Sequence, residues 1–124
     1  MRVELARRYN FAAAHHLPRA PKHHKCRRLH GHSYEIEVAI RGEVDPLMGW
    51  LMDYGQLDEL VASVIAELDH RTLNDIPGLE NATSEALCGW LWEKLAVKLP
   101  GLHRISVAET CAATCHYFGN AERQ

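Results

Sequence analysis

Residues 30–41 alternate in polarity, and this pattern constrains the fold more than any other feature of the chain. One parity carries His30, His32, Tyr34, Ile36, Val38 and Ile40, and the other carries Ser33, Glu35, Glu37 and Arg41. A period of two predicts a β-strand with one buried face. A second strand is predicted over residues 3–13, where, with Arg7 as the exception, one parity is apolar: Val3, Leu5, Tyr9, Phe11 and Ala13.

Two helices are predicted between these strands and the C-terminus. Apolar residues recur at helical spacing over residues 54–68, with Asp53 as the N-cap, and again from Thr83 or Ser84 to Leu99. Further strands are predicted at 103–111 and 115–118. The order β-β-α-α-β-β favours an α+β fold, in which an antiparallel four-stranded sheet carries two helices on one face.

The composition is typical of a soluble domain. The chain has 124 residues, of which 47% are hydrophobic, so we expect residues 1–124 to form one domain. It has no apolar run long enough to span a bilayer and no secretory leader, so we expect a cytoplasmic protein without a membrane partner. The four cysteines are then expected to be reduced.

Positive charge is concentrated near the N-terminus. Between Glu4 and Glu35 there is no acidic residue, yet this stretch holds seven of the 14 Lys and Arg and six of the nine histidines. Within a chain of net charge −2, such a zone indicates a site for a small anion, or else a solvated basic loop. The overall balance and the lack of a recognition motif argue against nucleic acid.

Three histidines are candidate metal ligands. His30 and His32 leave the same face of their strand, and His15 continues the inward parity of the first strand. Three neutral imidazoles form a zinc site with one open position, which is the catalytic pattern. The alternatives are histidines satisfied by hydrogen bonds or exposed, and a non-catalytic zinc-stabilised module with a fourth protein ligand. His16 is expected to point the other way.

Cys26 and the pair Asp69–His70 are candidates for proton transfer. Cys26 lies among Lys25, Arg27 and Arg28, and cations stabilise the reactive thiolate. Asp69 and His70 are predicted at the end of the first helix and can form an acid–base relay with Cys26. The alternatives are a cysteine that only packs and a histidine that only caps the helix.

Glu109 lies on the apolar parity of the last long strand. A carboxylate facing inward is costly unless it is paired. It therefore either pairs with an internal arginine or binds a ligand with two adjacent N–H donors, and the edge of a pterin ring is such a ligand.

These segments together resemble the 6-pyruvoyltetrahydropterin synthase superfamily over about residues 11–117. The resemblance is carried, in order, by FAAAHHLP, HKCRRLHGH, GEVDPLMGWLMDY, LDHRTLNDIPGLENATSE and ETCAATC. It implies zinc ligands at His15, His30 and His32, catalytic roles for Cys26, Asp69 and His70, and pterin binding by Glu109 with Thr83 and Ser84. It also implies a T-fold and a homo-oligomer, commonly a hexamer of two trimers, with pterin pockets between subunits.

Three residues separate Cys26 from His30, as in the branch of 6-carboxytetrahydropterin synthases. This resemblance implies a Zn²⁺-dependent lyase that converts 7,8-dihydroneopterin triphosphate to 6-carboxy-5,6,7,8-tetrahydropterin, releasing acetaldehyde and triphosphate, on the route to queuosine, a modified tRNA base. The nearest alternative is 6-pyruvoyltetrahydropterin synthesis. His16 and Ala82 depart from the family pattern, where Arg and Pro are common, and leave the substrate preference open.

Overall fold

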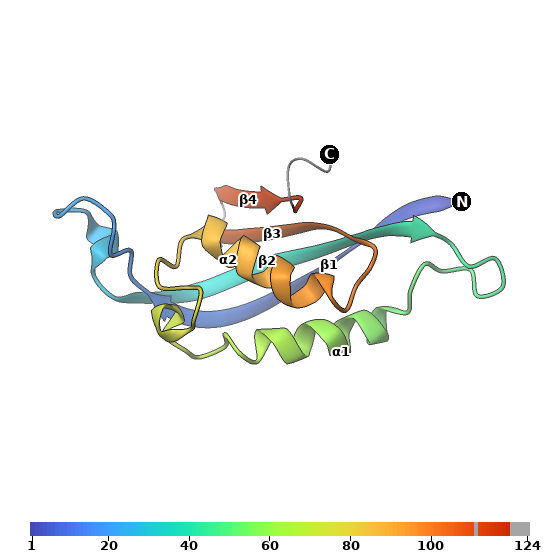
Figure 1. The fold of residues 1–124 in the computed structure, drawn as a ribbon, viewed down its shortest axis with the longest axis horizontal. Helices are drawn as coiled ribbons and strands as arrows, with labels where there is room; N and C mark the ends of the chain where they lie inside the picture. Colours follow the sequence, from blue (N-terminus) through green and yellow to red (C-terminus); the bar gives the residue numbers. More distant parts are fainter. Residues whose placement is uncertain (111, 120–124) are drawn as a thin grey trace.

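The computed structural model describes residues 1–110 and 112–119. Its strands and main helices follow one another as β1 (Arg2–His15), β2 (His30–Glu43), α1 (Tyr54–Ile65), α2 (Ser84–Ala96), β3 (Leu102–Thr110) and β4 (Ala113–Tyr117). Two short 3-10 helices, η1 (Lys25–Arg27) and η2 (Leu73–Asp75), lie in the connections. Neighbouring strands pair antiparallel in the order β1-β2-β3-β4, which confirms the predicted sheet (Figure 1).

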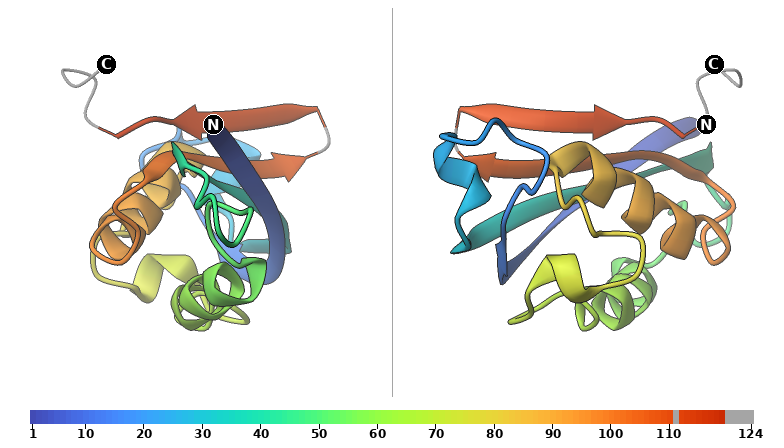
Figure 2. Two further views of the ribbon diagram at one scale, coloured as in Figure 1. Left: turned by 90° about the vertical axis from the view of Figure 1, so that its right-hand side faces the viewer. Right: turned by 60° about the vertical axis from the view of Figure 1, so that its left-hand side comes forward.

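Both helices lie against one side of the curved sheet, as predicted (Figure 2). The inward parity of each strand supplies the core: Phe11 and Ala13 from β1, Tyr34, Ile36 and Val38 from β2, and Ile105 and Val107 from β3. These side chains pack in one cluster with the buried faces of α1 and α2. The alternation that predicted the strands therefore also sets which side chains the helices cover.

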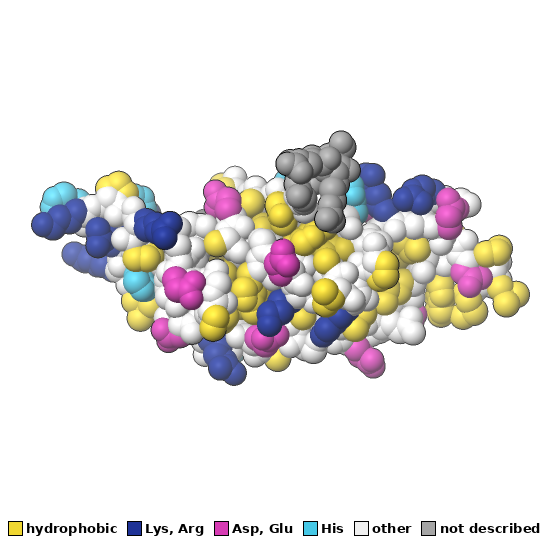
Figure 3. Space-filling view, viewed as in Figure 1, with side chains coloured by type: hydrophobic (Ala, Val, Ile, Leu, Met, Phe, Trp, Pro, Cys, Tyr) yellow, Lys and Arg dark blue, Asp and Glu magenta, His cyan; other side chains and the backbone are white. Residues whose placement is uncertain are grey.

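The β1–β2 ladder fixes where the candidate ligands meet. Its pairing runs from Arg2 opposite Glu43 to His15 opposite His30, so the loop of residues 16–29 leaves and rejoins the sheet at these two histidines. This loop forms one end of the elongated molecule, where Lys and Arg side chains gather together with histidines (Figure 3). The metal-ligand candidates and the basic zone are thus neighbours in space.

Both helices end earlier than predicted. α1 stops at Ile65 rather than residue 68, because the chain turns so that His70 reaches β1 with a left-handed backbone (φ 58°). α2 stops at Ala96 rather than Leu99, since Pro100 disfavours helical backbone in the residue before it. Residue 111, where the third strand was predicted to end, lies outside the described residues. No helix in the described ranges is long and apolar enough to cross a membrane.

Candidate active site

Three imidazoles converge where β1 ends and β2 begins. His15 is the last residue of β1, and His30 and His32 occupy the first and third positions of β2. One nitrogen from each ring lies within 4.8 Å of the others, and no other trio of such side chains within residues 1–110 and 112–119 is grouped in this way. His15 is buried and its two neighbours are half-buried, so the cluster faces both the core and an accessible side.

The backbone orients all three rings in the same way. The Nδ1 atoms lie 2.7 Å from the carbonyl oxygen of Ala82 for His15, 2.8 Å from that of Arg28 for His30, and 3.1 Å from that of Ser33 for His32. A carbonyl oxygen only accepts, so each Nδ1 carries a proton, and in the neutral imidazole the Nε2 atom then has the lone pair. This is the arrangement by which proteins orient histidines that bind a metal.

The atoms that face the centre of the cluster are hydrogen-bond acceptors that lie close together. The Nε2 atoms of His15 and His32 are 3.3 Å apart, and the Oε1 atom of Glu109 lies 3.2 Å from each. Lone pairs and a carboxylate at these distances repel one another unless a positive charge lies among them. Burial also lowers the pKa of His15, which favours the neutral imidazole that a metal requires. The residues present therefore fit a divalent metal ion such as zinc.

Glu109 is held by the N-terminus of α2. Its Oε2 atom accepts a hydrogen bond from the Ser84 hydroxyl, while Thr83 caps the helix by accepting the backbone N–H of Ala86 at 3.1 Å. The alternative that an internal arginine pairs with Glu109 is wrong for the described residues, where its partners are Ser84, His15 and His32. The three residues implied for pterin binding, Thr83, Ser84 and Glu109, are thus brought together beside the histidine cluster.

Tyr34 is a site residue that the sequence analysis treated only as part of a strand. It is 1% exposed, and its hydroxyl is the one buried side-chain polar atom in the described structure without a hydrogen-bond partner. Its ring stacks on Phe11, with centroids 5.0 Å apart, and lies 4.3 Å from the His32 ring centroid. Burial, and then the charge of Glu109, raise the pKa of this hydroxyl, which stays protonated as a donor. The sequence feature that could have indicated this position is that Tyr34 lies two residues after His32, on the same face of the strand.

Asp69 and His70 are fixed to the outer edge of β1. Asp69 accepts the backbone N–H of Ala12 at 3.1 Å, and the backbone N–H of His70 donates to the Ala12 carbonyl at 2.6 Å. Their side chains pair at 2.9 Å between the His70 Nδ1 and Asp69 Oδ1 atoms. The pair lies in the turn after α1 rather than in the helix. His70 and His32 line the same shallow hollow of about 480 Å³, together with Ala12 and its neighbours.

Cys26 lies in η1, within the loop that joins His15 to His30. Its backbone N–H donates to the Nδ1 atom of His24 at 3.0 Å, and its carbonyl accepts from Leu17 at 2.7 Å. The thiol is half-buried. Within the described part of this one chain, Cys26 forms no hydrogen bond with Asp69 or His70, so the predicted relay is not assembled here.

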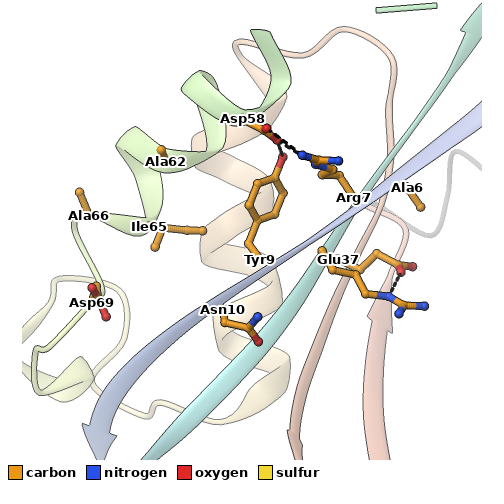
Figure 4. Close-up of a pocket in the computed structure, with 11 residues that line it drawn as sticks. Ala6, Arg7, Tyr9, Asn10, Glu37, Asp58, Ala62, Ile65, Ala66 and Asp69 are labelled. Atoms are coloured by element: carbon orange, nitrogen blue, oxygen red, sulfur yellow. Dashed lines mark hydrogen bonds and ion pairs between the residues drawn. The ribbon is translucent and has the colours of Figure 1, made fainter. Parts of the chain in front are cut away.

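A second hollow, of about 930 Å³, lies between β1 and α1 (Figure 4). Its central groups already bind one another: Asp58 accepts from Tyr9 at 2.7 Å and from two nitrogens of Arg7 at 3.1 Å. The hydrogen bond from Tyr9, followed by that from Arg7, lowers the pKa of Asp58. This satisfied cluster lacks the convergent lone pairs of the histidine site.

Comparison with known proteins gives one consistent family. Residues 4–120 match the family described as 6-pyruvoyl tetrahydropterin synthase. A 6-carboxy-5,6,7,8-tetrahydropterin synthase from Synechocystis sp. is 42% identical, over 89% of this chain and 88% of that protein. A dihydroneopterin monophosphate aldolase from Pyrococcus furiosus is 38% identical, over 88% and 91%. The structure of Caenorhabditis elegans 6-pyruvoyl tetrahydropterin synthase superposes with a TM-score of 0.89 at 29% identity, covering 97% of both chains.

Proposed function

The chain belongs to the 6-pyruvoyl tetrahydropterin synthase family, and on that premise we propose that it is a zinc-dependent 6-carboxy-5,6,7,8-tetrahydropterin synthase. Its substrate is 7,8-dihydroneopterin triphosphate, and its products are 6-carboxytetrahydropterin, acetaldehyde and triphosphate. The observation that carries the proposal is the meeting of three Nε2 lone pairs with the carboxylate of Glu109. It supports a cation site beside an anion that suits the donor edge of a pterin.

The protein's own residues divide the work of the reaction. When zinc is bound by His15, His30 and His32, it supplies Lewis acidity to the hydroxyl oxygens of the substrate side chain. Glu109, supported by Ser84, binds the N–H edge of the pterin ring and fixes its orientation. Cys26 accepts or returns protons at the side-chain carbons, and His70, oriented by Asp69, relays them. The proposed reaction requires protons to be removed from the side-chain carbons of the substrate.

The choice of product rests on the short segment before His30. Cys26 lies four positions earlier, which matches the carboxy branch, and the Synechocystis relative carries that name. The second candidate is 6-pyruvoyltetrahydropterin synthesis, favoured by the structural likeness to the C. elegans protein. Incubation with 7,8-dihydroneopterin triphosphate separates the two, because only the carboxy product is accompanied by acetaldehyde. Release of triphosphate without acetaldehyde would contradict the proposal.

We also propose that the active site is completed between subunits of a homo-oligomer, a hexamer of two trimers. Within the described residues of one chain, Cys26 forms no hydrogen bond with Asp69 or His70, although the relay requires both. Mixing an inactive Cys26→Ala protein with an inactive His70→Ala protein, after reversible dissociation, tests this. Recovery of part of the turnover is expected if the two residues act across an interface, and no recovery if they act within one chain.

A further inference from the structure

We propose that the loop of residues 16–29 is the phosphate-binding part of this site, in which cationic side chains hold the triphosphate of the substrate. The five cations are Arg19, Lys22, Lys25, Arg27 and Arg28. The identity of the ligand rests on the proposed function, whereas the affinity of the loop for phosphate is measurable without turnover. The inference rests on the absence of acidic partners for these charges in the described ranges, the shape of the loop and its place beside the histidines.

The charges of the loop have no acidic partner among the described residues. All five side chains belong to exposed residues, and none forms an ion pair within the described ranges. By contrast, acidic partners bind five cations elsewhere in the fold: Arg7, Arg8, Arg41, Lys94 and Arg104. A group of five like charges is unfavourable on its own, and an anionic ligand relieves that repulsion.

The loop has a defined shape despite its exposure. The Leu17 N–H donates to the Cys26 carbonyl at 2.7 Å and closes the base of the loop, and the His24 N–H donates to Pro21 at 2.7 Å. Near its end, the Arg28 carbonyl accepts from the Nδ1 atom of the metal-ligand candidate His30. The backbone of the loop is therefore ordered and joined to the histidine cluster at Arg28, so folding already meets part of the entropy cost of ordering this segment around a ligand.

The order of groups along the site matches the order of groups along the substrate. Glu109, held by Ser84, contacts the cluster at His15 and His32, whereas the loop contacts it at His30 through the Arg28 carbonyl. A pterin triphosphate carries its ring at one end, a hydroxylated three-carbon chain in the middle and phosphates at the other end. A ring held by Glu109, with its hydroxyls at the histidines, therefore directs the phosphates toward the loop.

Binding of two oxidised, fluorescent pterins tests the proposal without any reaction. Neopterin triphosphate and neopterin differ only in the phosphates, so the ratio of their dissociation constants for the zinc-loaded protein measures the phosphate contribution. We expect tighter binding of the triphosphate, with a ratio that falls as salt rises. The variant Arg19→Gln/Lys22→Gln/Lys25→Gln should weaken triphosphate binding by about tenfold or more, at roughly two- to fivefold for each charge. Neopterin affinity should remain within about twofold.

Two further variants show whether a change in triphosphate affinity comes from the charge of the loop or from its structure. Arg2→Gln removes an exposed cation at the far end of β1 and should leave the ratio unchanged. Arg27→Lys keeps the charge but alters the side chain that reaches the Ala20 carbonyl at 3.4 Å, so its loss of triphosphate affinity should be smaller than that of the triple variant. Equal affinity of the wild-type protein for both pterins overturns the proposal, as does an equal loss of both in the triple variant. Neither result depends on which product the enzyme makes.

Discussion

His15 and His30 form the last pair of the β1–β2 ladder, and their ring centroids lie 4.5 Å apart. A β-ladder is a rigid support, so its register positions two of the three metal-ligand candidates relative to one another. His32 follows two residues later on the same face and completes the group. A slip of one residue in the ladder would turn all of its side chains to the opposite face, so the hydrophobic core and the metal site depend on the same register.

We predict one zinc ion per chain, bound by these three histidines. The variant His30→Ala/His32→Ala should lose the metal, because a single imidazole cannot hold it. The matched control is His16→Ala, which removes the neighbouring histidine that lies outside the cluster and should retain full zinc. Metal analysis of the purified proteins is the measurement, and a full complement of zinc in the double variant would contradict the assignment.

The sequence was sufficient for the strands, the helices and the grouping of the histidines. Each depended on a periodic pattern: the alternation of residues 30–41 set the burial of β2, and the parity of His15 and His32 placed both on one face. The helix ends were less predictable, because the left-handed backbone of His70 and its contacts with Ala12 arise from tertiary packing. Local propensity cannot report contacts between residues so far apart in the chain.

The remaining features of the site depend on contacts that no spacing reveals. The Ala82 carbonyl orients His15 across a separation of 67 residues, and Ala82 had been noted only as a departure from the family pattern. The unpartnered hydroxyl of Tyr34 could not be recognised before its surroundings were known. The predicted catalytic roles of Cys26, Asp69 and His70 stay predictions, since a relay among them requires contacts that one chain does not contain.

Replacing Cys26 by alanine should abolish turnover while zinc and fold are retained. Proton transfer by a positioned side chain typically contributes roughly 10²–10⁴-fold in rate, so we expect a loss of that size. Cys115→Ala is the control, because Cys115 is also a half-buried free thiol but lies on β4, away from the loop. Measured kcat values decide the role of Cys26: a near-normal rate in its variant would leave it as a packing residue only.

Asp69→Asn should lower turnover and change the acid stability of the protein. The backbone N–H of Ala12, and then His70, hold the pKa of Asp69 below its ordinary value of 3.8. The carboxylate therefore stabilises the fold above that value, and this contribution is lost as pH falls through the lower folded pKa. The asparagine variant lacks this titration, so its deficit in unfolding free energy should be largest near about pH 6 and shrink below about pH 4.

The control for Asp69 is Asp75→Asn, which removes an exposed carboxylate in η2 and should affect neither turnover nor the acid limb. Denaturant unfolding at a series of pH values gives the stability difference. A deficit that stays constant down to about pH 3 would mean that the charge of Asp69 contributes nothing to the fold.

Tyr34→Phe should show whether the unpartnered hydroxyl lowers the stability of the fold and whether it contributes to pterin binding. A buried donor without a partner costs about 1–3 kcal/mol, so the phenylalanine variant should be as stable as the wild-type protein, or more stable, in the absence of ligand. If a bound pterin or an ordered water at the metal accepts from this hydroxyl, pterin affinity should fall. Thermal unfolding and pterin titration are the two measurements, and unchanged pterin affinity would exclude a binding role for the hydroxyl.

Glu109→Gln should weaken the binding of pterins, including inert oxidised ones, without loss of zinc. The glutamine keeps the shape and can still accept from Ser84, but it presents a donor where the pterin edge presents donors of its own. A hydrogen bond to a charged group contributes about 1.5–3 kcal/mol, so loss of one or two such bonds should raise the dissociation constant by at least roughly tenfold. Ser84→Ala removes only the support of the carboxylate and should cause a smaller loss.

Two other outcomes would each assign Glu109 a different role. Its contacts with Ser84, His15 and His32 can serve stability alone, in which case Glu109→Gln should lower the melting temperature and leave pterin affinity unchanged. Its Oε1 atom also lies 3.2 Å from the Nε2 atoms of His15 and His32, so loss of zinc from the variant would place the carboxylate among the metal ligands instead. Pterin affinity measured at full zinc occupancy distinguishes the three roles. Under that condition, Glu109→Gln weakens pterin binding only if the carboxylate binds the ring.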